Sequence, residues 1–199
     1  MTEEAPVEET FISHLVELRD RLVKAIIGVA IVCIGLMIWP GPKEIYDFLA
    51  EPMIASLPPG AQMIATGVVA PFLVPMKVTL MFALIVALPW VFYQMWAFVA
   101  PGLYAHEKRL VLPLVISSSA LFIAGVAFCY FLVFGRVFHF IAEFAPSSIA
   151  VMPDIENYLD FVMSMCLAFG ATFEVPVVVV ILYAWVSSAS KSSRKSVPT

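Results

Sequence analysis

The chain has 199 residues, of which 62% are hydrophobic and 13% are charged, and its mean hydropathy is +0.97. Such a composition excludes an ordinary water-soluble domain and predicts an integral membrane protein in contact with the lipid bilayer. The formal net charge of -4 is spread over an N-terminal arm and the expected external loops, so the sequence offers no patch for nucleic acid.

The two ends of the chain are polar. Residues 1–10, MTEEAPVEET, are acidic and lack the basic start of a secretory signal or transit peptide, so we expect a disordered cytoplasmic arm. Residues 187–199 are rich in serine and low in complexity, which predicts a disordered cytoplasmic tail. Residues 11–186 between them form the predicted membrane domain.

Four apolar stretches are long enough to cross a bilayer as helices, for which about 20 residues are needed. The predicted spans cover about 22–39, 72–99, 110–140 and 158–186. Because proline interrupts the hydrogen bonds of a helix, kinks are predicted in or at the ends of the last three spans. The prolines concerned are Pro75, Pro89, Pro113 and Pro176. The predicted fold class is therefore all-α, a curved polytopic membrane helix bundle with four spans.

The basic residues predict how the bundle is oriented. Of the 11 lysines and arginines, eight lie in the N-terminal flank, the 100–109 loop or the C-terminal tail. Because such residues stay on the cytoplasmic side, both termini are predicted to be cytoplasmic. The segment of about 43–70 then forms an external cap. Its apolar residues recur at helical spacing from Lys43 to Leu57, with Phe48 among them, which indicates an amphipathic helix.

The stretch FISHLVELRDRL, just before the first span, carries acids where basic residues are usual. As a helix, it places His14, Glu17 and Arg21 on one polar stripe. One interpretation is a self-satisfied pair between Glu17 and Arg21, worth roughly a few tenths of a kcal/mol. The other is that Glu17 is held at the membrane surface to bind a cationic ligand.

The second cytoplasmic loop repeats this arrangement within QMWAFVAPGLYAHEKRL at 94–110. Trp96, Phe98 and Tyr104 form a predicted interfacial aromatic belt, and Glu107 lies among basic residues. Two such clusters on one face present two carboxylates to a cation. Arginine is the best match, because its planar fork forms two parallel bonds to a carboxylate.

Two ionisable residues lie within the predicted spans. Glu174 is about 16 residues into the last span, where a charged side chain is costly unless it is paired, hydrated or protonated. We expect a functional role there, with a buried, protonated filler as the alternative. Lys77 lies near the outer end of its helix, where its side chain can snorkel to the interface.

The sequence carries no pattern typical of catalysis. Cys33, Cys129 and Cys166 fall inside apolar runs without the spacing of metal ligands, so we interpret them as small buried hydrophobic residues. The short motifs of metalloproteases, hydrolases, P-loop proteins and dinucleotide-binding proteins are missing, so neither enzyme activity nor a cofactor is expected. Glu174 and Lys77 leave open a small-solute or proton-coupled transporter, although no internal repeat supports it.

Five ordered motifs run through nearly all of the chain up to about residue 186. They are SHLVELRDRL at 13–22, MIATGVVAPFLVPMKV at 63–78, YQMWAFVAPGLYAHEKR at 93–109, PLVISSSALF at 113–122 and TFEVP at 172–176. Together they resemble TatC, the multi-spanning core of twin-arginine protein translocases. That family has six spans and this chain ends after four, so we expect a truncated or naturally short form.

The resemblance implies that signal peptides with two consecutive arginines bind at the cytoplasmic face. The residues at the matching positions are Glu17, Arg19, Phe98, Leu103 and Glu107. Glu174 matches the family's intramembrane glutamate, which implies contacts with the single-span partners TatA and TatB. The resemblance also implies a homo-oligomer within a complex of the cytoplasmic (inner) membrane of a prokaryote. That complex would export folded proteins at the expense of the proton gradient.

Overall fold

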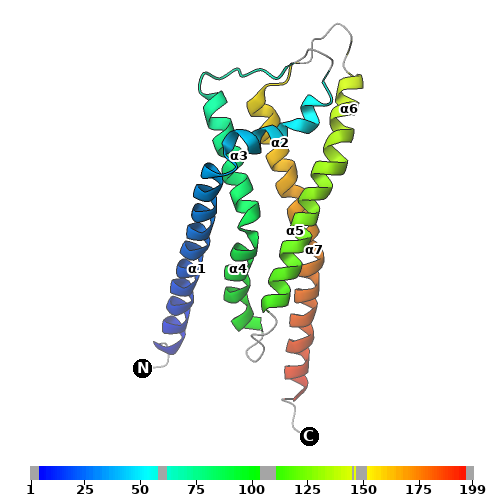
Figure 1. The fold of residues 1–199 in the computed structure, drawn as a ribbon. Helices are drawn as coiled ribbons and strands as arrows, with labels where there is room; N and C mark the ends of the chain where they lie inside the picture. Colours follow the sequence, from blue (N-terminus) through cyan, green and yellow to red (C-terminus); the bar gives the residue numbers. More distant parts are fainter. Residues whose placement is uncertain (1–4, 58–61, 104–110, 145, 147–151, 196–199) are drawn as a thin grey trace. The chain divides into compact units, whose positions relative to one another are not determined.

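The described part of the chain is built from helices that follow the predicted apolar stretches. A computed structural model describes residues 5–57, 62–103, 111–144, 146 and 152–195, with side chains for 12–57, 62–99, 111–144, 146 and 152–183. In chain order (Figure 1) the helices are α1 (Ala5–Ile38), α2 (Pro42–Ile54), α3 (Ala70–Val86), α4 (Leu88–Leu103), α5 (Val111–Phe128), the π-helix η2 (Cys129–Phe134), α6 (Gly135–Phe144) and α7 (Ile155–Lys195).

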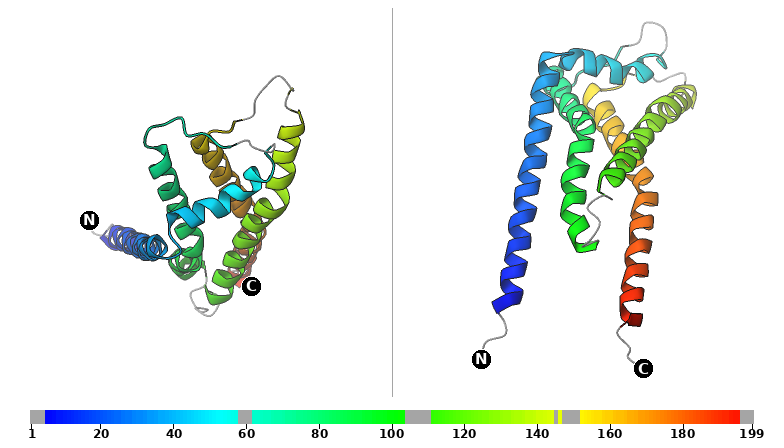
Figure 2. Two further views of the ribbon diagram at one scale, coloured as in Figure 1. Left: turned by 45° about the horizontal axis from the view of Figure 1, so that its top comes forward. Right: turned by 60° about the horizontal axis from the view of Figure 1, so that its bottom comes forward.

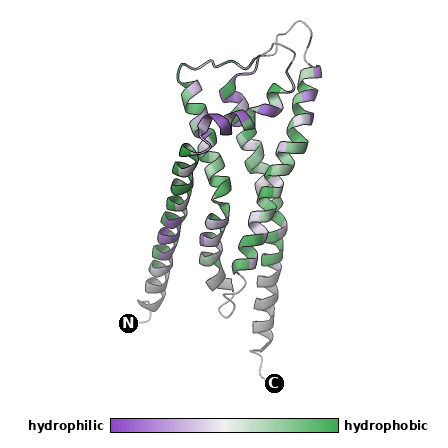
Figure 3. Ribbon diagram, in the orientation of Figure 1, coloured by the Kyte–Doolittle hydropathy of each residue, from purple (hydrophilic) through white to green (hydrophobic). Residues whose placement is uncertain are grey.

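The helices confirm the predicted fold class. Within the described residues, three helical stretches are long and apolar enough to cross a membrane: Ile12–Ile38, Val111–Phe144 and Ile155–Tyr183. The pair α3 and α4 passes the same test as one broken span, which gives four. Apolar residues follow these spans along most of their length, whereas polar residues gather on α2 and in the first half of α1 (Figure 3).

The break between α3 and α4 falls where proline predicts it. Ala87 separates the two helices, two residues before Pro89. Because Pro89 has no N–H, the backbone cannot continue the helical hydrogen-bond pattern through this point. By contrast, α7 continues as a helix past Pro176.

Both terminal helices extend further than composition predicts. α1 begins at Ala5 and α7 reaches Lys195, so helix extends into the arm (1–10) and into the tail (187–199). Once a long span has formed, each further residue adds one hydrogen bond without a new nucleation step, which favours such extension.

The helices divide into two units, each described by itself. Unit 1 consists of Met1–Ile31, Ala87–Ser119 and Pro176–Thr199. Unit 2 consists of Val32–Val86 and Ala120–Val175.

Unit 2 contains a hydrophobic core that α2 covers. This short helix runs across the helices of its unit and contacts α3, η2 and α6 (Figure 2). Its residues Ile45, Leu49 and Ala50 are at most 4% exposed. They belong to one buried cluster that also includes Val74, Val78, Phe134, Phe138, Leu159 and Val162. The core of this unit therefore joins α2 to α3, η2, α6 and α7.

Two tyrosine hydroxyls join α2 to the neighbouring helices. Tyr130 in η2 donates to the carbonyl of Phe48 (2.6 Å), and Tyr158 in α7 donates to the carbonyl of Leu49 (2.9 Å). Pro52 lies inside α2 and has no N–H, so the Phe48 carbonyl, four residues earlier, has no donor within its own helix. Tyr130 supplies that donor from another helix.

The π-helix that carries Tyr130 has no counterpart in the sequence analysis. Its six residues, Cys129–Phe134, lie between α5 and α6 without a proline or a polar run. Cys129 and Phe134 are fully buried there, and Phe138 follows one turn later, stacked on Phe134 at 5.5 Å between ring centres. Cys129 and Cys166 are buried as predicted, whereas Cys33 is only half-buried.

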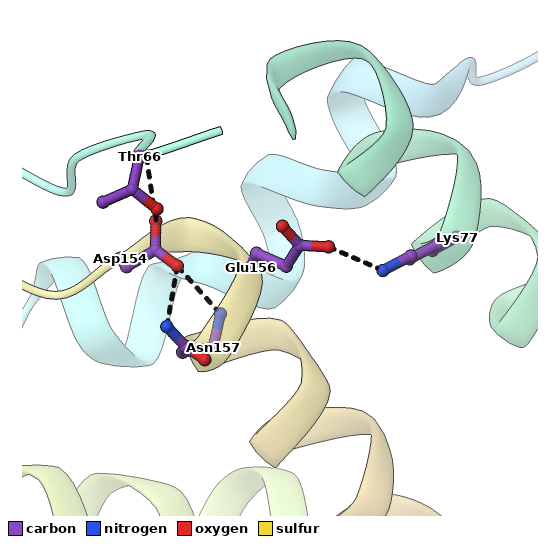
Figure 4. A network of polar contacts seen from close by, with 5 residues as sticks. All are labelled: Thr66, Lys77, Asp154, Glu156 and Asn157. Carbon is purple, nitrogen blue, oxygen red and sulfur yellow. Dashed lines mark hydrogen bonds and ion pairs between the residues drawn. The ribbon is translucent and has the colours of Figure 1, made fainter. Parts of the chain in front are cut away.

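Asp154 holds the end of the cap segment against the start of α7 (Figure 4). Its carboxylate accepts bonds from the N–H and hydroxyl of Thr66, at 3.1 and 3.0 Å. The backbone N–H and side-chain amide of Asn157 bond to its other oxygen, at 3.2 and 2.9 Å. A backbone bond from Ile64 to Pro153, at 2.9 Å, adds to this contact.

Lys77 forms an ion pair that the sequence analysis did not predict. Its Nζ lies 2.9 Å from Oε1 of Glu156, which is in the first turn of α7 (Figure 4). Both side chains remain nearly half exposed. That Lys77 snorkels to the interface stays a prediction, and the structure adds a carboxylate partner from the same unit.

We predict that Tyr130→Phe lowers the free energy of unfolding by about 1 kcal/mol, because the Phe48 carbonyl loses its donor. Pro52→Ala restores a backbone N–H four residues after Phe48 and should reduce that loss. A double-mutant cycle, measured by denaturant unfolding of the purified protein in detergent, will show this coupling. An equal cost of Tyr130→Phe with Pro52 or Ala at position 52 would contradict the explanation.

The hydrogen bonds from Thr66 lower the pKa of Asp154 below its ordinary value of 3.8. The folded state thus favours the charged form. Asp154 should therefore stabilise the protein above about pH 4, and this contribution should be lost as the pH falls through the lowered pKa. Between about pH 2 and 6, the free energy of unfolding should depend less on pH in Asp154→Asn than in the unaltered chain. Glu143→Gln, which changes an exposed carboxylate of the same unit, should keep the pH dependence of the unaltered chain.

Candidate functional site

Unit 1 contains the first of the two polar clusters. Unit 1 is formed by α1 up to Ile31, α4, the first part of α5 and the last part of α7. The start of α1, the end of α4 and the end of α7 lie at the same end of this unit (Figure 1). These three helix ends therefore lie at one end of the unit, and the cytoplasmic orientation of the termini stays a prediction.

A ring contact joins α1 to the end of α4. The rings of His14 and Phe98 are stacked, with centres 4.4 Å apart and planes 19° from parallel. Stacked rings contribute about 0.5–1.5 kcal/mol beyond the area they bury. The contact places the SHLVELRDRL motif beside the YQMWAFVAPGLY motif, although more than 80 residues separate His14 from Phe98.

Trp90 makes a second contact between the same two helices. Its indole N–H donates to the carbonyl of Lys24 in α1, at 2.9 Å. The indole lies directly against Gly28, where an added Cβ would come within 2.5 Å of Nε1. A side chain at position 28 would therefore force the two helices to rearrange.

A third contact joins α4 to α5. The indole of Trp96 donates to the hydroxyl of Ser118 at 3.2 Å, and both residues are buried. Together the three contacts fix α4 between α1 and α5. They thereby also fix the position of Phe98, which lies in the last turns of α4.

Glu17 forms the local ion pair considered above. Nη2 and Nε of Arg21 lie 2.8 and 2.9 Å from the same carboxylate oxygen, Oε1. The Glu17 side chain is 40% exposed. The Arg21 side chain is 26% exposed, and a helix pair at this spacing contributes only about 0.3–0.5 kcal/mol. Within the described residues Oε2 of Glu17 accepts no hydrogen bond, so the carboxylate retains an open acceptor.

Arg19 points to solvent beside Glu17. It binds the neighbouring Asp20, with Nη2 and Nε at 2.8 and 3.1 Å from Oδ1, and its side chain is 72% exposed. Each arginine of this stretch thus has an acid beside it, which lowers the net positive charge around Glu17 and lessens repulsion of a cationic ligand.

Two of the predicted site residues are not placed by the structure. Glu107 lies outside the described residues, and the side chain of Leu103, the last residue of α4, is likewise not described. Of the predicted set, Phe98 lies against α1 through its stack on His14, three residues before Glu17, while Glu17 and Arg19 each pair with a neighbour in α1. Whether Glu107 joins them stays a prediction.

Glu174 lies in unit 2 and is described there. Its side chain is half-buried, and its Oε1 atom is buried from solvent. The preceding turn of α7 packs tightly on α5, since a Cβ at Gly125 would lie 2.6 Å from the carbonyl oxygen of Phe169. Phe173, next to Glu174, packs on Phe128 of α5 at 5.8 Å. The intramembrane acid thus follows a close contact between two spans.

The site also contains residues that the sequence analysis did not assign. His14 was placed on the polar stripe, but not as the partner of Phe98. Trp90 and Gly28 were not singled out, because a glycine or a tryptophan in an apolar run is common. The sequence places Gly28 in the first span and Trp90 in the second, and nothing in these positions predicts that the two residues touch.

Comparison with known proteins gives the same family throughout. Residues 13–196 match the family described as TatC, Sec-independent protein translocase protein. The chain is 47% identical over 195 residues to the Sec-independent protein translocase protein TatC of Escherichia coli strain K12, covering 96% of this chain and 74% of that protein. It is 45% identical over 174 residues to the protein of the same name from Haemophilus influenzae, covering 87% and 67%.

Solved structures agree with these relatives. The chain is similar to the crystal structure of a twin-arginine translocase receptor, TatC, with a TM-score of 0.75 and 34% identity, over 85% of this chain and 74% of that one. A structure of the same receptor in the detergent DDM gives a TM-score of 0.76 and 34% identity.

We predict that Gly28→Val lowers the free energy of unfolding by about 1–3 kcal/mol, because the added side chain overlaps the indole of Trp90. Gly35→Val is the matched control, since no atom lies within 4 Å of a Cβ added there. Trp90→Ala should remove most of the difference between the two variants. Equal costs at Gly28 and Gly35, measured by unfolding in detergent, would show that the α1–α4 contact is not as described.

Proposed function

The chain belongs to the TatC family of Sec-independent protein translocase proteins, and from this premise we propose that it captures signal peptides with two consecutive arginines at its cytoplasmic face. As a family member it is a multi-pass protein of a bacterial inner membrane and a core subunit of the twin-arginine translocase. This membership favours a translocase subunit over the small-solute transporter considered from the sequence.

The observation that carries the proposal is the way Glu17 binds a guanidinium in the structure. Arg21 reaches one carboxylate oxygen through two nitrogens, at 2.8 and 2.9 Å. This internal pair is a partly exposed i,i+4 pair on a helix surface and therefore weak, so an arginine of a peptide can displace Arg21 or bind at Oε2. A lysine has no planar fork and would form fewer of these bonds.

The remaining predicted residues complete the proposed peptide site. Phe98 would supply an apolar surface, and its stack on His14, three residues before Glu17, supports this role. Leu103 would extend that surface, Glu107 would supply the second carboxylate, and Arg19 would orient the acidic cluster through Asp20. In this proposal both termini face the cytoplasm, on the side where the peptide arrives.

We further propose that Glu174 contacts single-span partners similar to TatA and TatB. Its carboxyl group lies in an apolar span, where a polar group on a partner helix would gain a strong contact. The assembled complex would contain several copies of the chain and would export folded proteins at the expense of the proton gradient. The close α5–α7 packing beside Glu174 supports a preformed surface for such a partner.

The proposal is tested by crosslinking an arginine-pair signal peptide to membranes that contain the chain. Glu17→Gln and Glu107→Gln should each reduce capture about tenfold, since each removes a charge-assisted hydrogen bond worth about 1.4 kcal/mol or more. Glu143→Gln is the matched control, because it changes an exposed carboxylate of unit 2 that has no part in the proposed peptide site, and it should change capture little.

Two further comparisons separate the roles of the acids. A peptide with two lysines should be captured less by the unaltered chain. Glu174→Gln should leave capture unchanged and reduce co-purification of the single-span partners. Capture that is the same in the Glu17 and Glu107 variants as in the unaltered chain would refute the peptide site.

A further inference from the structure

A cavity of about 430 Å³ lies in unit 2, between the start of α2 and the start of α3. Its lining is mostly apolar and rich in proline, with Pro40, Pro42, Pro71 and Pro75 among the residues. It also includes two charged residues, Lys43 and Glu44. A second cavity of about 310 Å³ shares Lys43, Pro71 and Pro75 and adds Asp47. The first volume falls within the range of small-molecule binding sites in proteins.

The larger cavity opens at the level where an apolar span ends. The span of α1 ends at Ile38, and Trp39, which follows, is 81% exposed. Phe72 in the lining is 68% exposed. An exposed tryptophan next to the end of an apolar span is typical of the depth at which lipid headgroups lie. A lipid headgroup can therefore reach this cavity directly from the bilayer.

The charges of the cavity do not neutralise each other within the protein. Among the described residues neither Lys43 nor Glu44 takes part in an ion pair or a side-chain hydrogen bond. The cavity region thus presents one ammonium group with one carboxylate beside it and a second, Asp47, one helical turn along. A ligand that carries an anion and a hydrogen-bonding cation, joined by a short link, complements this arrangement.

We propose that this cavity binds the zwitterionic phosphoethanolamine headgroup of a membrane lipid. Lys43 binds the phosphate, and Glu44 accepts hydrogen bonds from the ethanolamine ammonium. The acyl chains lie over Phe72 and Met76, which continue the apolar lining toward the span. The proline-rich walls limit the conformations of the free site, so little ordering is required when the headgroup binds.

The same charges discriminate against the other common headgroups. A purely anionic headgroup, such as phosphoglycerol, meets Lys43 but also two carboxylates without a cation to offer them. Phosphocholine carries a cation, but its trimethylammonium group has no N–H to donate to Glu44. Phosphoethanolamine alone of the three satisfies both Lys43 and Glu44.

The test is native mass spectrometry of the purified chain equilibrated with equal amounts of phosphatidylethanolamine, phosphatidylcholine and phosphatidylglycerol. The chain should retain phosphatidylethanolamine above the other two. Lys43→Gln should reduce its retention about tenfold, as expected for the loss of one charge-assisted contact. Glu44→Gln should abolish the preference of ethanolamine over choline and raise the retention of phosphatidylglycerol.

Matched controls keep the outcome interpretable. Lys24→Gln changes a lysine outside the cavity, and Glu51→Gln changes a glutamate of α2 that does not line it, so both should retain the lipid as the unaltered chain does. Thermal unfolding in detergent establishes that each variant is folded. Equal retention of the three lipids, or a loss in the control variants as large as in Lys43→Gln, would overturn the proposal. Capture of the signal peptide is measured separately and does not depend on this result.

Discussion

Away from water, each backbone N–H and carbonyl has to find its partner within the protein, and this requirement explains most of the structure. It accounts for a described chain that is almost entirely helical and for the places where the helices depart from regularity. Pro89 coincides with the break between α3 and α4, and Pro52 releases a carbonyl of α2 that Tyr130 then satisfies. The irregular points are therefore also points where one helix is joined to another.

The candidate site depends on how closely α1 approaches α4. Gly28 leaves room for the indole of Trp90, whose N–H reaches the Lys24 carbonyl, and His14 stacks on Phe98 further along the same pair of helices. These contacts are made by aromatic rings and a backbone carbonyl. The charged residues beside them remain at least partly exposed and weakly paired. Different side chains therefore hold the two helices together and bind the proposed ligand.

Hydrophobic periodicity and proline positions predicted the spans, the break near Pro89 and the polar stripe of α1, because each follows from spacing along one segment. The amphipathic pattern also predicted α2, with Phe48 on its apolar stripe. In the structure Phe48 is 46% exposed and stacks on Tyr130, and the helix ends at Ile54, soon after Pro52. The π-helix, the Lys77–Glu156 pair and the Trp90 bond escaped prediction, since the partners in the last two lie 79 and 66 positions apart.

The Glu17–Arg21 pair has a consequence for how a bound peptide would leave. Arg21 is tethered one helical turn from Glu17, so it remains present at high effective concentration while a guest occupies the carboxylate. As the peptide arginine dissociates, Arg21 can rebind the Glu17 carboxylate, so the carboxylate does not remain unpaired. If Glu17 binds the peptide as proposed, an internal competitor of this kind would shorten the residence time of the bound peptide.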